Sequence, residues 1–274
     1  MVKFAAALAA LLVAAGPGVA QVEDDPDIVR VLAYNVKHGL GMDGRVDLER
    51  IASVIRSLEP DVVTLQEIDS VTTRTSLEDQ AARLGELTGM RAVFGGFMSY
   101  RGGQYGMALL SRYPIVEWAN HRLPDGAEPR SALAARIELL RPGYGEAPQL
   151  VVVGVHLYAT AEERLAQARR MVELFANEET PVVLAGDFNS LPQSPVIQLL
   201  EDEGGWFRPA KMGQPFTFPA DMPEREIDFI MLRPGDRFAV REHRVVEETL
   251  ASDHRPVLME LELLPADVPT ETAP

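Results

Sequence analysis

A pattern that occurs twice constrains the fold of this chain more than any other feature. In each copy a helical segment is followed by a proline, a run of apolar residues and an acid; the copies run from Leu58 to Glu67 and from Glu179 to Asp187. Apolar runs of this length predict buried strands. Burying their polar ends unpaired would cost about 1–3 kcal/mol per group, so these ends should lie in loops, where α/β proteins carry their chemistry. The pattern predicts an α/β protein with two similar halves.

The remaining periodicity predicts further strands, punctuated by Gly and Pro, and four helices. The strands are expected at 28–35, 106–111, 115–122, 132–139, 150–156, 226–232, 238–246 and 256–263. The helices are expected from an Asp47 N-cap to Leu58, from a Ser76/Asp79 cap to about Thr88, from a capping box at Thr160–Glu163, and from Pro195. Alternating helices and strands with a strand-rich middle favour mixed sheets covered by helices. Residues 28–264 contain no segment typical of a linker, which predicts one domain.

The first twenty residues are typical of a secretory signal peptide. Lys3 precedes an apolar run from Phe4 to Ala15, and small residues lead up to Ala20, after which we expect cleavage. The predicted location is therefore secreted or periplasmic, with an uncleaved anchor as the alternative. Residues 21–27 form an acidic leader, and residues 265–274 are expected to be a disordered tail. Because the chain contains no cysteine, its stability must come from a hydrophobic core.

The charge of the chain argues against a polyanionic partner. With 41 acidic and 26 basic residues the formal net charge is −15, and no Lys/Arg run is present that would follow a nucleic-acid backbone. Duplex DNA is therefore not favoured as a substrate. No heptad repeat or large apolar face indicates an oligomer, so we expect a monomer.

Polar side chains gather where the predicted strands begin and end. Four strands end in such residues and two segments place them at strand starts: Asn35, Glu67, His156, Asp187 with Asn189, Asp228, and Ser252–Asp253–His254. In a mixed sheet the ends of some strands share an edge with the starts of their antiparallel neighbours, so all these groups can meet in one cleft. Carboxylates, amides and imidazoles without thiolate suit Mg²⁺ or Mn²⁺ and metal-assisted attack of water on a phosphate ester.

Six motifs in this order resemble the endonuclease/exonuclease/phosphatase family, which includes DNase I-like nucleases, inositol polyphosphate phosphatases and neutral sphingomyelinases. They are Tyr34–Asn35, Leu65–Gln66–Glu67, Gly154–Val155–His156, Gly186–Asp187–Phe188–Asn189, Ile227–Asp228–Phe229 and Ser252–Asp253–His254–Arg255–Pro256. The resemblance spans residues 28–263. It implies a DNase I-like four-layer sandwich, in which two packed mixed β-sheets are flanked by helices.

The resemblance also implies roles for these residues. Glu67, Asn35 and Asp253 would hold the metal ion, with Asn35 alternatively contacting a phosphate oxygen. Asp187 would orient or deprotonate the attacking water. Asn189, His156 and His254 would contact the phosphoryl group, and Asp228 would fix the tautomer of His254 and raise its pKa.

Three further residues are weaker candidates for contacts with the substrate phosphate. Arg130 matches an arginine that contacts phosphate in parts of the family. Nuclease members pair the first histidine with a Glu on a middle strand, but residues 103–107 contain no Glu, so the partner of His156 is unassigned and Tyr105 is a candidate replacement. His38, in a glycine-rich loop, is within reach of the cleft, although a solvated loop histidine is the simpler interpretation. His121 and His243 lack a motif context and are expected at the surface.

Together these features predict an exported, Mg²⁺- or Mn²⁺-dependent phosphoesterase that hydrolyses a phosphodiester by attack of activated water. A small or lipid head-group diester is favoured, and the apolar, glycine-bearing segment 94–100 is either a loop that touches lipid or an interior connection. The alternatives are a secreted DNase I-like nuclease, a non-catalytic binding module on the same fold, and a zinc hydrolase using His38, His156 and His254.

Overall fold

The computed structural model describes residues 28–140, 147–158 and 160–265. The predicted signal peptide, the acidic leader and all but Pro265 of the predicted tail lie outside these residues. Within the described ranges, no helix has both the length and the apolar character needed to cross a bilayer.

Two mixed β-sheets form the centre of the molecule, as predicted. The first sheet has the order β10-β11-β1-β2-β4-β3 and the second the order β5-β6-β7-β8-β9. The strands are β1 Ile28–Asn35, β2 Val62–Ser70, β3 Arg91–Tyr100, β4 Gly103–Ser111, β5 Ile115–Arg122, β6 Ser131–Glu138, β7 Gln149–His156, β8 Val182–Asp187, β9 Asp228–Arg233, β10 Phe238–Val245 and β11 Val257–Leu263. The parallel pairs β1/β2 and β7/β8 are the two predicted halves.

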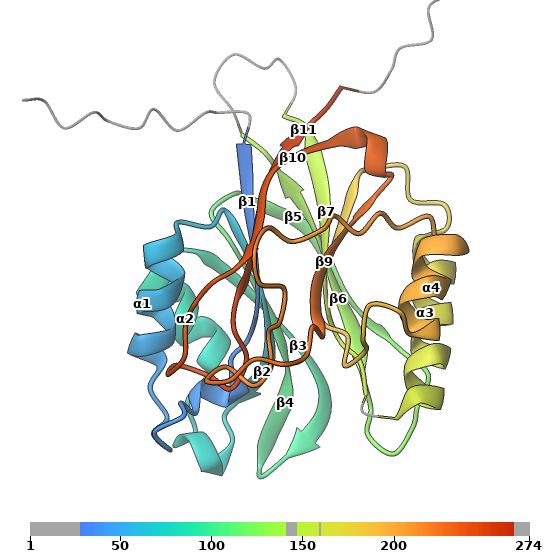
Figure 1. The fold of residues 1–274 in the computed structure, drawn as a ribbon. Coiled ribbons are helices and arrows are strands. Elements are labelled where there is room, and N and C mark those ends of the chain that lie inside the picture. The colour runs from blue at the N-terminus through green and yellow to red at the C-terminus, as the bar shows by residue number, and fades with distance from the viewer. Residues whose placement is uncertain (1–27, 141–146, 159, 266–274) are drawn as a thin grey trace, which may run out of the picture.

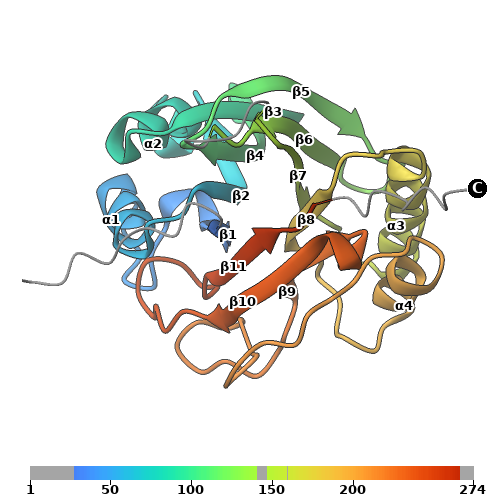
Figure 2. The same cartoon turned by 90° about the horizontal axis from the view of Figure 1, so that it is seen from above.

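Helices cover the outer face of each sheet and complete four layers (Figures 1 and 2). The helices α1 Leu48–Leu58 and α2 Gln80–Thr88 lie against the first sheet, and α3 Ala161–Phe175 and α4 Pro195–Asp202 lie against the second. The observed starts of α1 and α4 agree with the predicted caps: Asp47 accepts a hydrogen bond from Arg50 N, and Pro195 occupies the first turn after Ser194.

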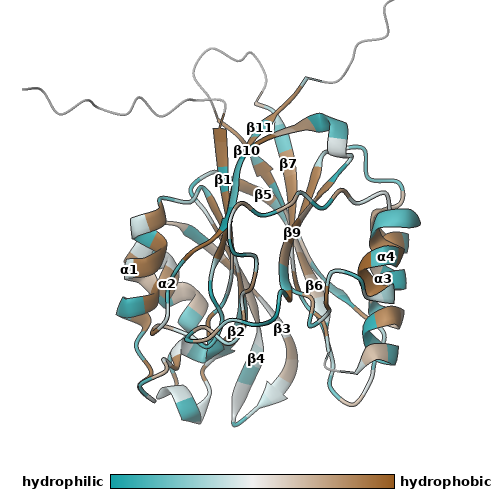
Figure 3. Cartoon of the chain, in the orientation of Figure 1, coloured by the Kyte–Doolittle hydropathy of each residue, from teal (hydrophilic) through white to brown (hydrophobic). Residues whose placement is uncertain are grey.

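The core has three layers that follow from the alternation of side chains along each strand. Val31 and Ala33 face the second sheet, whereas Leu32 and Tyr34 face α1. Because both faces of the central strands are covered, their sequences are continuously apolar rather than alternating. Figure 3 shows this as hydrophobic strands between helices whose outer faces are hydrophilic.

Two predicted caps differ in the structure. The second helix begins after Asp79, whose side chain accepts from Ala82 N, while Ser76 ends a preceding 3-10 turn. At α3, the Thr160 hydroxyl donates to Glu163 Oε2 instead of accepting from a backbone amide, so the predicted capping box is not formed. At α2 the Asp79 carboxylate therefore takes the capping position, and at α3 the N-cap side chain makes no bond to a helix amide.

Segment 94–100 is a strand, and its interpretation as a lipid-touching loop or an interior connection was wrong. It belongs to β3, which pairs antiparallel with β4. The two glycines in it weaken the strand pattern. At Gly95 there is a packing reason, because a Cβ there would lie 2.8 Å from Asn120 Oδ1, whose side chain is held by a hydrogen bond to the Gly96 carbonyl oxygen.

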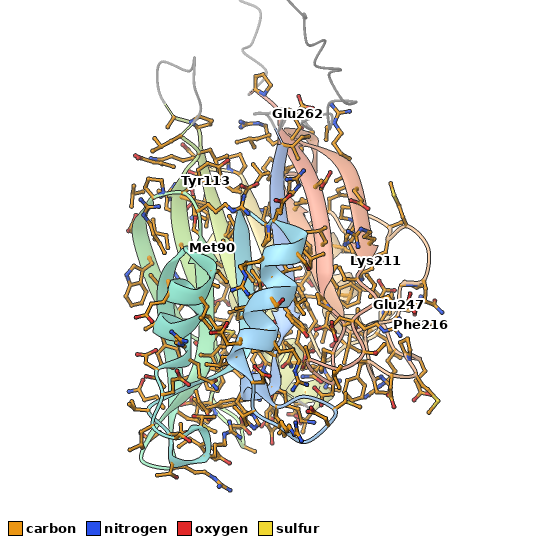
Figure 4. The ribbon with its side chains drawn as sticks, turned by 90° about the vertical axis from the view of Figure 1, so that its left-hand side faces the viewer. Met90, Tyr113, Lys211, Phe216, Glu247 and Glu262 are labelled. Atoms are coloured by element: carbon orange, nitrogen blue, oxygen red, sulfur yellow. The ribbon has the colours of Figure 1, made fainter. Side chains whose placement is uncertain are left out.

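His243 is buried, not at the surface as predicted. It lies on β10 with 1% of its surface exposed, and its Nδ1 lies 3.1 Å from the Pro209 carbonyl oxygen. Its cover is the segment that passes outside β10, on which Figure 4 labels Lys211 and Phe216. Burial, followed by the charge of Lys211, lowers the pKa of His243 to about 3 from an ordinary 6.5.

The buried neutral His243 should make stability fall below neutral pH. The unfolded chain takes up a proton near pH 6.5 and the folded chain only near pH 3, so this contribution declines as pH falls below 6.5. At pH 5.0 the loss should be about 2 kcal/mol. Urea unfolding at pH 7.5 and 5.0 should show this extra loss in the wild type but not in His243→Asn, whose amide nitrogen can replace Nδ1. Equal losses in both proteins would contradict it.

Candidate active site

Residues of the first sheet reach the candidate site from the ends of its two parallel strands. Asn35 is the last residue of β1, and Glu67 lies on β2 at a break in the register with β4, with φ +60°. Such a bulge re-aims one side chain out of the alternation of the strand. Asn35 is buried, and its Nδ2 donates to Glu67 Oε1 at 3.2 Å and to Asp187 Oδ2 at 3.1 Å. One amide therefore connects the two sheets.

Three adjacent strands of the second sheet contribute residues at the same level. His156 ends β7, Asp187 ends β8 and Asp228 begins β9, and the register pairs His156 with Asp187 and Asp187 with Asp228. All three side chains are buried. The predicted convergence of strand ends and antiparallel strand starts is therefore present in the structure.

Gly186 is required directly before Asp187. Its φ of +145° is a backbone conformation that L side chains rarely adopt, and a Cβ there would lie 2.1 Å from the Val155 carbonyl oxygen. The same Cβ would lie 2.8 Å from Gln66 Nε2 of the facing sheet. The close approach of the two sheets under the site thus depends on this glycine.

Asp187 is the centre of the cluster. Its Oδ1 accepts from Asn189 N at 2.8 Å, and its Oδ2 lies 3.5 Å from His156 Nε2 and 3.7 Å from His254 Nε2. Burial and the negative charge of Asp228 raise the pKa of Asp187 to about 7. A carboxylate with a pKa near neutrality can accept a proton from water at physiological pH.

His254 is held by a carboxylate on its far side. Its Nδ1 lies 2.9 Å from Asp228 Oδ2, which also accepts from the Thr217 hydroxyl at 2.5 Å. Burial alone would lower the pKa of His254, but the charges of Asp228 and Asp187 outweigh it and raise the pKa to about 10. The imidazole is thus a cation at neutral pH, with Nε2 directed toward Asp187.

His156 has the opposite electrostatics. Burial, followed by the positive charges of Arg130 and His254, holds its pKa well below the ordinary value, so the ring is neutral. Its Nδ1 is buried and makes no hydrogen bond to any residue that the structure describes. The partner that residues 103–107 did not offer in the sequence is therefore not supplied elsewhere in the described chain.

Two of the predicted metal-binding residues, Glu67 and Asp253, place their carboxylates at the more open side of the cluster. Burial and the charge of Asp253 raise the pKa of Glu67, so the two carboxylates repel each other. Lys37 Nζ, 2.7 Å from Asp253 Oδ2, provides one cation there. A hard cation fits this excess of carboxylate oxygen. Asn35 turns its nitrogen toward Glu67, while its Oδ1 accepts from Lys37 N at 3.2 Å, so its role as a ligand stays a prediction.

A second group of potential ligands lies deeper. One ligand atom from each of Asp187, Asp228 and His254 lies within 4.8 Å of the others. A metal ion there would compete with the hydrogen bonds that Asp228 Oδ2 accepts from His254 and Thr217. The assignment of Glu67 and Asp253 as the metal-binding pair therefore stays a prediction.

The three weaker candidates border this cluster. Arg130 is buried, its guanidinium lies 4.9 Å from the Phe97 ring centroid and 5.3 Å from that of Tyr158, and its charge reaches His156. Tyr105 is buried, and burial followed by the charge of Glu67 raises its pKa. The side chain of His38 is partly buried; burial and the charge of Arg74 lower its pKa to about 4.

Sequence reasoning missed several residues that position the site. Lys37 stands two residues after Asn35 and was not among the residues predicted from the sequence. Thr217 and Phe218 belong to a long connection without periodicity; Thr217 bonds Asp228, and the Phe218 ring centroid lies 4.8 Å from that of His254. Of these residues, only Lys37 carried a signal in the sequence, because it stands two residues after Asn35.

Comparison with known proteins gives concordant results. Residues 32–254 match the model of the Endonuclease/Exonuclease/phosphatase family. The protein YbhP of Escherichia coli K12 is 29% identical, over 85% of this chain and 96% of YbhP. The crystal structure of an endonuclease/exonuclease/phosphatase from Beutenbergia cavernae is similar with a TM-score of 0.68 at 27% identity, covering 88% of this chain and 72% of that one.

A more distant structure shares the fold. The mannosyl-6-phosphatase Bt3783 of Bacteroides thetaiotaomicron has a TM-score of 0.67 at 19% identity, covering 85% of this chain and 99% of that one. At this identity the likeness concerns the fold alone.

A divalent cation should stabilise the protein through Glu67 and not through Asp228. Ligands that bind only the folded state add about 2.7 kcal/mol at one hundred times Kd, which raises the melting temperature. We expect Mg²⁺ or Mn²⁺ to give this increase in the wild type and in Asp228→Asn, but not in Glu67→Gln. Differential scanning fluorimetry with the ion or with EDTA measures it without a substrate. If the ion still raises the melting temperature of Glu67→Gln but no longer raises that of Asp228→Asn, the ion binds at Asp187, Asp228 and His254.

Proposed function

Because the chain belongs to the endonuclease/exonuclease/phosphatase family, whose members hydrolyse phosphate esters, we propose that it is an exported, monomeric phosphodiesterase that depends on Mg²⁺ or Mn²⁺. The observation that carries this proposal is the position of Asp187 Oδ2, 3.5 Å from His156 Nε2 and 3.7 Å from His254 Nε2. One buried carboxylate therefore faces two imidazoles at a single point, and Asp228 supports one of them from behind.

These residues suit direct attack of water on phosphorus. Asp187 orients the water and accepts its proton as the new P–O bond forms and the ester P–O bond breaks. The protonated His254 donates to a phosphoryl oxygen, where negative charge increases in the transition state, or protonates the departing alcohol. Neutral His156 and the Asn189 side chain flank the same oxygens. The metal ion, held by Glu67 and Asp253, would withdraw charge from the phosphoryl group.

The substrate we favour is a small or lipid head-group phosphodiester rather than duplex DNA. A net charge of −15 opposes the binding of a long polyanion, since non-specific DNA binding depends on a basic surface. A secreted nuclease remains the alternative for the same catalytic groups. A non-catalytic binding module is not favoured, because the carboxylates and histidines of the cluster are all present and mutually oriented.

Apolar side chains on the connections next to the site favour a lipid surface. Nine of the twelve exposed large hydrophobic residues lie on the connections that follow β1, β2 and β8 or precede β9 and β11: Met42, Val46, Val71, Leu77, Leu191, Phe207, Met212, Met222 and Leu250. Met42 and Leu250 are neighbours, since Met42 N donates to the Leu250 carbonyl oxygen at 2.8 Å. Such residues would enter the interfacial region of a membrane while the polar cluster meets a head group.

The proposal is tested by hydrolysis assays with the protein from Gln21 onward, in Mg²⁺ or in EDTA. The substrates are supercoiled plasmid, bis(4-nitrophenyl) phosphate, sphingomyelin, phosphatidylinositol species and inositol phosphates. We expect metal-dependent hydrolysis of a small or lipid diester, with kcat/KM about 10²–10⁴-fold lower in Asp187→Asn. His121→Asn, outside the cluster, is the matched control and should retain full activity.

Two outcomes would count against this function. Dominant nicking of plasmid would replace the small or lipid diester with DNA. If no substrate is hydrolysed and EDTA does not change the melting temperature, the non-catalytic binding module is favoured.

The apolar residues near the site should matter only for substrates in a membrane. In Met42→Ser/Leu250→Ser the ratio of turnover in vesicles to turnover of the soluble aryl diester should fall about tenfold, because less apolar area is buried at the interface. The control Val116→Ser/Trp118→Ser removes exposed apolar residues of β5 and should keep the wild-type ratio. An unchanged ratio in the first variant would argue against lipid contact by these connections.

A further inference from the structure

A groove next to the catalytic cluster has a charge of the opposite sign to that of the whole chain. Its volume is about 550 Å³, and none of the described residues that line it is acidic. Ser194 at the start of α4 forms part of one wall; the other lining residues are Arg164, Asn189, Leu191, Gln193, Arg225 and Ile227. Both charged residues that line the groove are arginines, which is unexpected in a chain with 41 acidic and 26 basic residues.

The side chain of Arg225 is connected to that of His254 through the ring of Phe218. Its guanidinium carbon is 4.6 Å from the centroid of the Phe218 ring, and that ring is 4.8 Å from the ring of His254. The residue is exposed, and it forms no ion pair with any carboxylate in the described part of the chain. Its charge is held in place by stacking and not neutralised.

Arg164 brings a second positive charge to the groove from α3. Its Nη1 donates to the Tyr158 carbonyl oxygen at 3.2 Å, and its charge interacts with that of Asp187. Asn189 connects the groove to the cluster directly, because it lines the groove while its backbone nitrogen donates to Asp187 Oδ1 at 2.8 Å. A substrate whose phosphoryl group lies against Asp187 can therefore extend past Asn189 into the groove.

Resting on the phosphoesterase function above, we propose that this groove binds a second phosphate group of the substrate, carried on the ester arm that extends past Asn189. Guanidinium groups offer several N–H donors in a plane that matches phosphate oxygens, and such charge-assisted bonds are strong. Leu191 and Ile227 provide apolar contact for the carbons between the two phosphates. The volume falls within the range of small-molecule sites.

Binding of two matched probes tests this proposal without hydrolysis. Isothermal titration calorimetry at fixed Mg²⁺ compares propyl phosphate with propane-1,3-diyl bisphosphate. We expect the bisphosphate to bind the wild type about tenfold more tightly, and Arg225→Gln to bring the two affinities within about twofold. Arg101→Gln, which removes an equal charge from the β3–β4 turn, is the control and should retain the preference.

Equal affinities in the wild type, or a preference that persists in both Arg225→Gln and Arg164→Gln, would overturn the proposal. A general loss of phosphate binding would lower both affinities together and leave the preference unchanged, so the ratio isolates the groove. If the protein hydrolyses simple diesters but does not bind the bisphosphate more tightly than propyl phosphate, only the proposal about the groove is contradicted. A preference for the bisphosphate in a protein that hydrolyses no diester would contradict the phosphodiesterase and leave the phosphate-binding groove standing.

A second arm identifies the source of the second phosphate. Turnover of phosphatidylinositol 4-phosphate relative to phosphatidylinositol in vesicles is measured for the wild type and Arg225→Gln. If phosphatidylinositol 4-phosphate is turned over faster than phosphatidylinositol and this advantage is lost in Arg225→Gln, the second phosphate belongs to a lipid head group. If this advantage is absent while the soluble bisphosphate is preferred, the substrate is a soluble bisphosphorylated ester.

Discussion

Asn35 holds together the three segments that make the site. Its side-chain nitrogen donates to Glu67 on the first sheet and to Asp187 on the second, and its backbone oxygen accepts the Ser252 hydroxyl at 2.7 Å. Ser252 directly precedes Asp253 and His254, so the Asp253 carboxylate and the cationic histidine are positioned from the same residue. Because Asn35 is buried at a strand end, its amide has little freedom and these distances are fixed before any substrate binds.

The electrostatics of the cluster follow from placing several carboxylates in one buried region. Burial and the charge of Asp228 raise the pKa of Asp187 to near neutrality, although the nearby imidazolium of His254, whose own pKa both carboxylates raise, acts in the opposite direction. Glu67 and Asp253 keep a mutual repulsion that Lys37 relieves only in part. Burying such charges unpaired is unfavourable by several kcal/mol. Binding of a cation next to Glu67 and Asp253 would therefore be favourable. In the proposed mechanism, acid–base chemistry would belong to the deep side of the cluster and metal binding to the open side.

Much of this arrangement follows from local sequence. The central strands were predictable because both faces are buried and their sequences are uninterrupted apolar runs, and the polar residues at their ends identified the site. What the sequence did not reveal depends on long-range contacts. Thr217 and Phe218 belong to a connection whose position is set only when it packs beside β9 and β11. His243 was misjudged because its cover comes from the segment around Pro209, and β3 was missed because two glycines weaken its pattern, one of which packs against a residue that lies elsewhere in the sequence.

The net charge of −15 and a phosphate-ester substrate are compatible because the positive groups are concentrated at the site. His254 and Arg130 lie beside the point where Asp187 meets the imidazoles, and Arg164 and Arg225 line the adjoining groove. Exposed charges more than about 10 Å apart are largely screened at physiological salt, so a small anion in the cleft senses mainly these local cations. A long polyanion would extend beyond the cleft and be repelled by the net negative charge of the chain. If the proposed function and groove are correct, the same charge distribution would select substrates by size as well as by the number of phosphates they carry.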